Sequence, residues 1–110
     1  MINILLIRDR GMFVKLKVYG HSGYDDIGKD IVCASVSVLS QSLIIGLDRV
    51  VNKDFFYLID EKDASLYVDI SNYSEENLKL AQVLMKTFKY TVDSLLLDYK
   101  KYINMKVEEQ

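Results

Sequence analysis

The sequence predicts a single α+β domain over residues 1–110, in which two helices pack on a four-stranded sheet in the order ββαββα. Two observations predict this fold. Twice along the chain, two short segments of strand-like composition flank a turn, which is typical of a β-hairpin. Each of these pairs is followed by a long stretch without proline in which apolar residues recur at helical spacing.

The first hairpin is predicted at the start of the chain. Residues 1–8 are mostly apolar and indicate a buried strand, and residues 9–11 (Asp-Arg-Gly) have the composition of a turn. Residues 13–19 then alternate between apolar and polar, which is the pattern of a half-buried strand. The residues that follow this strand are therefore predicted to lie at one edge of the sheet.

The first helix is predicted over residues 31–52, with Asp30 as its N-cap, because aspartate is among the best N-capping residues. Its apolar residues form two series on different sides of the helix. The core series is Val32, Val36, Leu39, Leu43, Leu47 and Val50, and the second series is Ile31, Val38 and Ile45. A helix that is apolar on two sides needs two partners. One is the sheet, and the other is the second helix or a sister subunit.

The second half repeats this pattern. Residues 55–59 and 65–70 are predicted strands joined by a polar turn. Ser74 is the predicted N-cap of a helix that reaches residue 102, long enough for part of it to support a dimer. Its predicted core residues are Leu78, Ala81, Met85, Phe88, Val92, Leu95, Tyr99 and Tyr102. The polar residues after position 104 are expected to fray.

Composition narrows the class of protein. An apolar content of 50% argues against disorder, and a net charge of -2 with a pI near 5.3 argues against a surface that binds nucleic acid directly. A single cysteine excludes an internal disulfide and fits a reducing, cytoplasmic location. No stretch is predicted to span a membrane, and residues 1–8 lack the basic leader of a signal peptide.

The region around the start of the first helix carries the chain's single histidine, His21, and its single cysteine, Cys33. With Asp30 as the N-cap, Cys33 lies in the first helical turn, where backbone amides lack helical partners and the dipole stabilises a thiolate. The glycine-rich loop between them can bring the imidazole back to the thiol. Such a pair supplies the nucleophile and the acid that acyl transfer requires. The residues alone leave open that Cys33 is a small core residue and His21 a polar loop residue.

This region also resembles a known family. Residues 20–23 (Gly-His-Ser-Gly), 28–34 (Gly-Lys-Asp-Ile-Val-Cys-Ala) and 36–39 (Val-Ser-Val-Leu) are similar to the signature of the Prp family, the ribosomal-processing cysteine proteases of bacteria. The resemblance implies the same order of elements and a homodimer. It also implies a substrate, the N-terminal segment of a large-subunit ribosomal protein, from which a short extension is removed.

The resemblance further implies roles for individual residues. His21 and Cys33 correspond to the catalytic pair, and Gly20, Asp30 and Ser37 correspond to supporting or substrate-binding positions. Read from the residues alone, Asp30 is better explained as a helix cap, a role that is compatible with catalysis. Ser37 is equally explained as a small residue that allows close packing.

Two loop residues depart from the family pattern. The chain has Ser22 and Ile27 where the family usually has alanine and often an aromatic residue, which puts substrate preference in doubt more than chemistry. The loop at residues 22–29 lies between the two reactive residues, and we expect it to be a lid or substrate-binding element. A passive connector is the alternative.

The predicted function is that of a cysteine endopeptidase. Cys33 attacks the scissile carbonyl, His21 activates the thiol and then protonates the leaving amine, and N–H groups at the helix start, including that of Cys33, form the oxyanion hole. The alternatives are a catalytically diverged peptide-binding module of the same fold and a redox-sensing thiol protein. No cofactor is expected, and a metal site is disfavoured because carboxylates would have to supply every ligand beyond one cysteine and one histidine.

Overall fold

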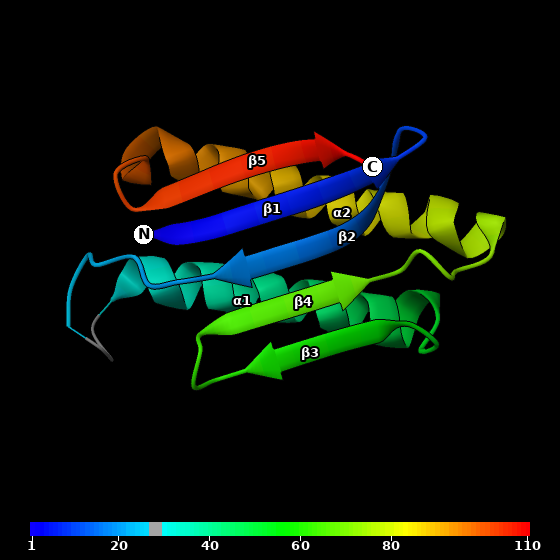
Figure 1. Ribbon diagram of the computed structural model, residues 1–110, viewed down its shortest axis with the longest axis horizontal. Helices are drawn as coiled ribbons and strands as arrows, with labels where there is room; N and C mark the ends of the chain where they lie inside the picture. The colour runs from blue at the N-terminus through cyan, green and yellow to red at the C-terminus, as the bar shows by residue number, and fades with distance from the viewer. Residues whose placement is uncertain (27–29) are drawn as a thin grey trace.

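A computed structural model describes residues 1–26 and 30–110. In this part of the chain, a mixed sheet of five strands has both helices on one face (Figure 1). The strands are β1 (Ile2–Asp9), β2 (Met12–Tyr19), β3 (Phe56–Asp60), β4 (Ser65–Asp69) and β5 (Ile103–Glu109), and the helices are α1 (Ile31–Gly46), the π-helical turn η1 (Leu47–Val51) and α2 (Glu75–Tyr99). The strand order across the sheet is β3-β4-β2-β1-β5.

Both predicted hairpins are confirmed. β1 and β2 pair antiparallel around a turn in which Arg10 and Gly11 have positive φ, and β3 pairs antiparallel with β4. β2 also pairs with β4, from Lys15↔Asp69 to Tyr19↔Ser65, and this pairing joins the two hairpins into one sheet. The strand bounds agree with the predicted ones because hairpins are encoded by local turn and alternation signals.

The prediction of four strands is wrong, because residues 103–109 form a fifth strand instead of a fraying tail. β5 runs parallel to β1, from Ile2↔Ile103 to Arg8↔Glu109. Ile103 is the one fully buried residue of β5, so the segment has almost no apolar alternation of its own. Its partner is more than 90 residues away in the chain, and so distant a pairing leaves no local signal.

The first helix has the predicted N-cap and core side, but it ends differently. Val32, Val36 and Leu43 are buried against the sheet, whereas Val50 of the predicted core series is 77% exposed. The chain makes a π-helical turn here, and the amide of Asn52 donates to the carbonyl of Leu47, five residues earlier. Because a π-turn uses more residues per turn than an α-helix, Val50 rotates away from the core.

The second helix confirms the predicted core side over a shorter length. Its core residues Ala81, Met85, Phe88 and Val92 are buried, but the helix ends at Tyr99.

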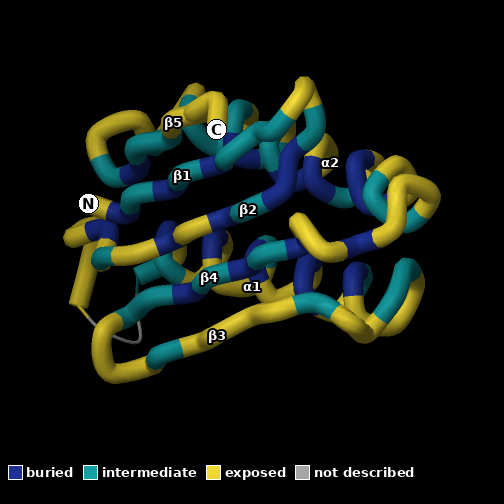
Figure 2. Tube along the Cα trace, turned by 45° about the vertical axis from the view of Figure 1, so that its right-hand side comes forward, coloured by how far each residue is buried: buried dark blue, intermediate teal, exposed yellow. Residues whose placement is uncertain are grey.

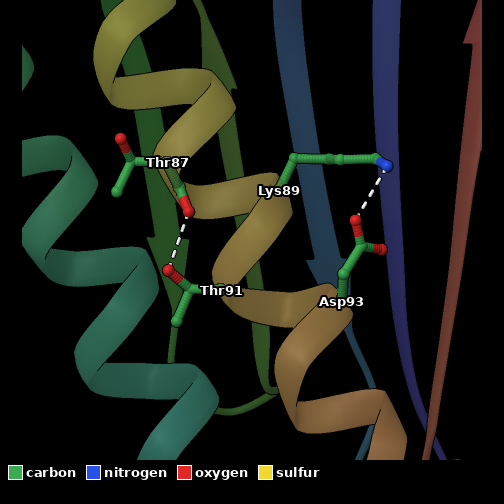
Figure 3. Close-up of polar contacts among 4 residues, drawn as sticks. All are labelled: Thr87, Lys89, Thr91 and Asp93. Atoms are coloured by element: carbon green, nitrogen blue, oxygen red, sulfur yellow. Dashed lines mark hydrogen bonds and ion pairs between the residues drawn. The ribbon is translucent and has the colours of Figure 1, made fainter.

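Polar side chains on the other sides of α2 bind groups one helical turn away. Figure 3 shows the ion pair between Lys89 and Asp93 and the hydrogen bond from the Thr91 hydroxyl to the Thr87 carbonyl.

The core lies between the sheet and the two helices. Figure 2 shows buried residues at alternate positions along β1, β2 and β4, whereas β3 is largely exposed. Gln82 of α2 is a buried polar residue whose side chain makes two hydrogen bonds with the backbone of Phe13, at 2.7 and 2.9 Å. These bonds tie the first half of α2 to the start of β2.

One helical stretch comes nearer to a membrane span than the sequence analysis allowed. Residues 31–51 have the length and apolar composition of a span, with a mean hydropathy of 1.7. The inner side of this stretch packs against the sheet and α2, and a core helix passes the same test of length and composition. The expectation that no segment has the length and composition of a membrane span is therefore wrong for residues 31–51.

Candidate active site

His21 is positioned by a tight turn at Gly20, where only glycine can be accommodated. β2 ends at Tyr19, and Gly20 follows with φ +96. A Cβ at Gly20 would collide with the backbone carbonyl of Met1, so any other residue would displace the turn. The Gly20 amide also donates to the Ala64 carbonyl, at 3.2 Å. These constraints place His21 just beyond the sheet, with its side chain exposed.

The cysteine is placed by the predicted helix cap. Oδ1 of Asp30 accepts hydrogen bonds from the amides of Val32 and Cys33, at 3.0 and 2.9 Å. This cap fixes the start of α1 at Ile31 and puts Cys33 in its first turn. The thiol is free and partly exposed, and the side chain also packs against the core.

Asp30 is held in its ionised form. Partial burial raises the pKa of this carboxyl, but hydrogen bonds from the Ser22 hydroxyl, from the amide and thiol of Cys33 and from the Val32 amide outweigh burial and lower the pKa to about 2. At neutral pH, Asp30 is therefore a hydrogen-bond acceptor and not a proton donor. Its second oxygen, Oδ2, accepts the Ser22 hydroxyl and ties the loop after His21 to the start of α1.

Two cavities meet at the reactive residues. The first has a volume of about 290 Å³ and the second about 370 Å³, and His21, Cys33 and Ser37 line both. The first cavity is walled by apolar residues of the sheet and α1 and by the turn between β3 and β4. Its other lining residues are Ile2, Val18, Gly20, Val36, Ser40, Gln41, Ile59, Asp60, Glu61, Ala64, Ser65 and Leu66. The second lies against the loop, and its other lining residues are Gly23, Asp25, Asp30 and Ala34.

The structure thus gathers all five residues singled out from the sequence around these cavities. Gly20 lines the first, Asp30 lines the second, and the other three line both. Ser37 lies one helical turn after Cys33, and its hydroxyl accepts a hydrogen bond from Gln41 Nε2 at 2.9 Å. Within residues 1–26 and 30–110 no hydrogen bond joins the imidazole to the thiol. In enzymes without substrate, such catalytic hydrogen bonds are often long.

The oxyanion hole predicted at the helix start is not supported. The amides of Val32 and Cys33 point to the Asp30 carboxylate, and that of Ala34 donates to the Asp30 carbonyl. All three amides already have a partner. Instead, the backbone N–H of Ser22 donates to the sulfur of Cys33, with N and S 3.3 Å apart.

The loop after His21 is also held in place at Tyr24. The ring of Tyr24 makes edge-to-face contacts with Tyr99 and Tyr102, with centroids 5.9 and 5.1 Å apart. Such contacts are favourable for aromatic pairs. The predicted lid comprises residues 22–29, and residues 27–29 lie outside the described residues.

Three contributors to the site were not predicted. Ser22, Tyr24 and Gln41 have partners that the sequence does not indicate, and the partners of Ser22 and Tyr24 lie across a loop or in another element. Spacing along one helix could have suggested the Gln41–Ser37 pair, but no local signal identifies the other two. Among the described residues, no group of three or more histidine, cysteine, aspartate or glutamate side chains is arranged to hold a metal ion.

Comparison with known structures places the fold among solved bacterial proteins. The chain superposes on the crystal structure of SMU.848 from Streptococcus mutans with a TM-score of 0.85 and 27% identity, over 100% of this chain and 96% of that one. It superposes on the essential ribosomal processing protease Prp from S. aureus, in complex with a covalently linked product peptide, with a TM-score of 0.83 and 18% identity, over 97% of this chain and 99% of that one. A second structure of that protease, with a substrate peptide, gives a TM-score of 0.80 and 17% identity over the same shares of both chains.

The family assignment comes from the sequence. No curated protein matches the chain, but residues 1–104 match the model of the family described as cysteine protease Prp. The match includes β1, β2, α1 and the loop with His21, together with everything up to the start of β5. The chain therefore belongs to the Prp family of cysteine proteases.

Proposed function

We propose that this chain is an endopeptidase that removes a short N-terminal extension from a large-subunit ribosomal protein, with Cys33 as the nucleophile and His21 as the general base. The observation that carries the proposal is that His21 and Cys33 line the same two cavities in a chain of the cysteine protease Prp family. A buried thiol, or a histidine on another face, would have favoured a diverged binding module. Cys33 is partly exposed beside His21 instead.

The shape of the site suits an extended peptide. Cys33 lines both cavities, so a chain that enters one and leaves through the other passes the sulfur. Apolar residues such as Val36 and Leu66 line the first cavity and offer contact to an apolar substrate side chain. Asp60 and Glu61, at its rim, add negative charge. In the S. aureus protease, peptides are bound in complexes of the same fold.

Besides water, the proposed reaction uses only side chains of this protein. His21 takes the proton of Cys33 as the sulfur bonds to the scissile carbonyl carbon, and it returns that proton to the leaving amine. Water then hydrolyses the thioester with His21 as the base. A partner that is protein and not RNA fits the net charge of -2, and a cytoplasmic location fits a free thiol.

The substrate is tested with a synthetic peptide that spans the N-terminus of the ribosomal protein from the same organism. Incubation with the wild-type enzyme, followed by mass spectrometry, is expected to show cleavage at one bond. A peptide of scrambled sequence is the control. Equal cleavage of both peptides, or cleavage at several bonds, would contradict a dedicated processing enzyme.

We also propose that the enzyme is a homodimer that buries the second apolar side of α1. Ile31, Val38 and Ile45 are 51%, 68% and 56% exposed and repeat along one side of the helix. A sister subunit that packs the same surface against them would cover apolar area that the sheet leaves in water. Val38→Glu is expected to halve the mass in sedimentation equilibrium. Lys79→Glu, on the exposed surface of α2, is the matched control, and a wild-type monomer would contradict the proposal.

A further inference from the structure

The hydrogen bonds around the thiol point to Ser22. Its backbone N–H donates to the sulfur of Cys33, and only 4% of the residue is exposed. Among the hydrogen bonds of the described residues, this is the one that a backbone amide donates to the reactive sulfur. An amide in this position stabilises negative charge wherever it develops next to that sulfur.

The backbone amides at the start of α1 are not free to stabilise such a charge. Those of Val32 and Cys33 are bound to the ionised carboxylate of Asp30, at 3.0 and 2.9 Å. A substrate oxygen would have to displace a full negative charge to recruit them. The Ser22 amide faces the reacting atom itself.

The side chain of Ser22 holds that amide in place. Its hydroxyl donates to Oδ2 of Asp30 and accepts the amide of Tyr24 at 3.1 Å. The other oxygen of the same carboxylate caps the helical turn that carries Cys33. Asp30 therefore fixes the Ser22 amide and the Cys33 sulfur relative to each other.

The chemistry of attack makes use of this arrangement. As the sulfur of Cys33 bonds to the scissile carbon, the carbonyl π electrons move to oxygen and the thiol proton passes to His21. When the intermediate collapses, the carbonyl bond re-forms, the C–N bond breaks and His21 gives the proton to the departing amine. The negative oxygen and the sulfur are bonded to the same carbon, and the proposal requires that the Ser22 N–H, which contacts the sulfur in the free enzyme, turns to that oxygen.

We propose that the backbone N–H of Ser22 is an oxyanion-hole donor of this enzyme, and that the Ser22 hydroxyl positions it through Asp30. The proposal rests on the proposed function as a cysteine endopeptidase. It replaces the helix-start amides with a donor from the loop that follows His21.

The direct test removes this N–H and leaves the side chain. Cys33 is the single cysteine of the chain, so a synthetic segment of residues 1–32 can be ligated chemically to a recombinant segment that begins at Cys33. An ester in place of the amide between His21 and Ser22 deletes the N–H. The matched control is an ester that deletes the N–H of Gly11, a residue of the turn between β1 and β2 that lines neither cavity.

Peptide cleavage at saturating substrate gives the decisive readout. The Ser22 ester is expected to lower kcat by about 100-fold with KM almost unchanged, because removal of one oxyanion donor acts on the transition state. The Gly11 ester is expected to retain kcat within about threefold, since Gly11 lies in the turn between β1 and β2 and lines neither cavity. Equal losses in both esters, or a Ser22 ester with wild-type kcat, would overturn the proposal.

A second measurement decides the matter if the Ser22 ester does not fold. A peptide aldehyde forms a tetrahedral adduct with Cys33, whereas the product peptide binds without one. Ser22→Ala is expected to weaken inhibition by the aldehyde about tenfold and to leave product binding unchanged. Equal effects on both ligands would refute the positioning role.

The ligation experiment also separates this inference from the proposed function. If the unmodified ligated enzyme does not cleave the peptide, the proposed function and this inference are both refuted. If the ligated enzyme is active and the Ser22 ester does not change its activity, this inference alone is refuted.

Discussion

The carboxylate of Asp30 accepts the backbone amide of Cys33 at 2.9 Å, and its other oxygen accepts the hydroxyl of Ser22. One charged side chain thereby sets the start of α1, the position of the reactive sulfur and the position of the loop that follows His21. The pKa of this carboxyl is about 2, against 3.8 for an ordinary aspartate, so the folded protein stabilises the ionised form of Asp30.

This linkage predicts how stability depends on pH. Because the folded-state pKa is the lower one, the contribution of Asp30 is fully present above about pH 4 and is lost as the pH falls towards 2. The difference in midpoint of thermal unfolding between wild type and Asp30→Asn should therefore be largest above pH 4 and shrink towards pH 2. Asp25→Asn removes a charge from the same loop and is the control. A difference that stays constant from pH 6 to pH 2 would contradict the assignment.

Gly20 is predicted to matter for activity as well as for stability. Gly11 and Gly20 both have positive φ, but an added Cβ meets nothing within 4 Å at Gly11, whereas at Gly20 it meets the Met1 carbonyl. Gly11→Ala should cost about 1 kcal/mol of unfolding free energy from backbone strain alone. Gly20→Ala should cost more and should also lower kcat/KM at least about tenfold, because it displaces His21.

Urea unfolding and peptide cleavage, measured on both variants, separate strain from displacement. Two variants of equal stability and equal activity would show that the contact between Gly20 and Met1 does not position the histidine.

Gln82 is predicted to be a structural residue remote from the chemistry. Its side chain satisfies both the amide and the carbonyl of Phe13 inside the core. Gln82→Leu leaves both groups buried without partners and should cost about 3 kcal/mol of unfolding free energy. Gln41→Leu removes an exposed side-chain hydrogen bond and should change stability by less than about 0.5 kcal/mol. Comparable losses in denaturant titrations of the two variants would rule out a special role for the Gln82 bonds.

The fifth strand supplies a further prediction. Ile103 is 2% exposed in the core, whereas Val107 of the same strand is 37% exposed. Ile103→Ala should cost about 3 kcal/mol because it leaves a cavity beneath the sheet. Val107→Ala should cost less than about 0.5 kcal/mol. Thermal unfolding of both variants tests whether the C-terminal segment is part of the core, and a negligible effect of Ile103→Ala would mean that it frays.

These cases show which features a sequence carries locally. The two hairpins, the Asp30 and Ser74 caps and the core sides of both helices follow from turn residues and periodicity within a few positions, and all were predicted. β5 was missed because its stability comes from pairing with β1 at the other end of the chain. Val50 was wrongly predicted to lie in the core because the spacing of the apolar residues does not indicate the π-turn.

The same distinction holds for the site. His21, Cys33, Asp30, Gly20 and Ser37 were identified from a compact stretch, and the structure brings them around two adjoining cavities. The bond between Ser22 and Asp30 closes across a loop, and neither residue type nor spacing specifies it. The helix-start amides were predicted to be oxyanion donors without weighing the cap bonds that occupy them, and the structure does not support that prediction.

The measurement that tests the central claim most directly is the rate of cleavage of the ribosomal peptide by wild type, Cys33→Ala and His21→Ala. We predict cleavage at one bond by the wild type and a loss of at least about 10³-fold in kcat in both variants, because nucleophile and base act as one unit. Ser35→Ala, on the same helix as Cys33 and bonded to the Ile31 carbonyl, should retain wild-type activity. Cleavage by Cys33→Ala at the wild-type rate would contradict the assignment of the nucleophile and with it the mechanism.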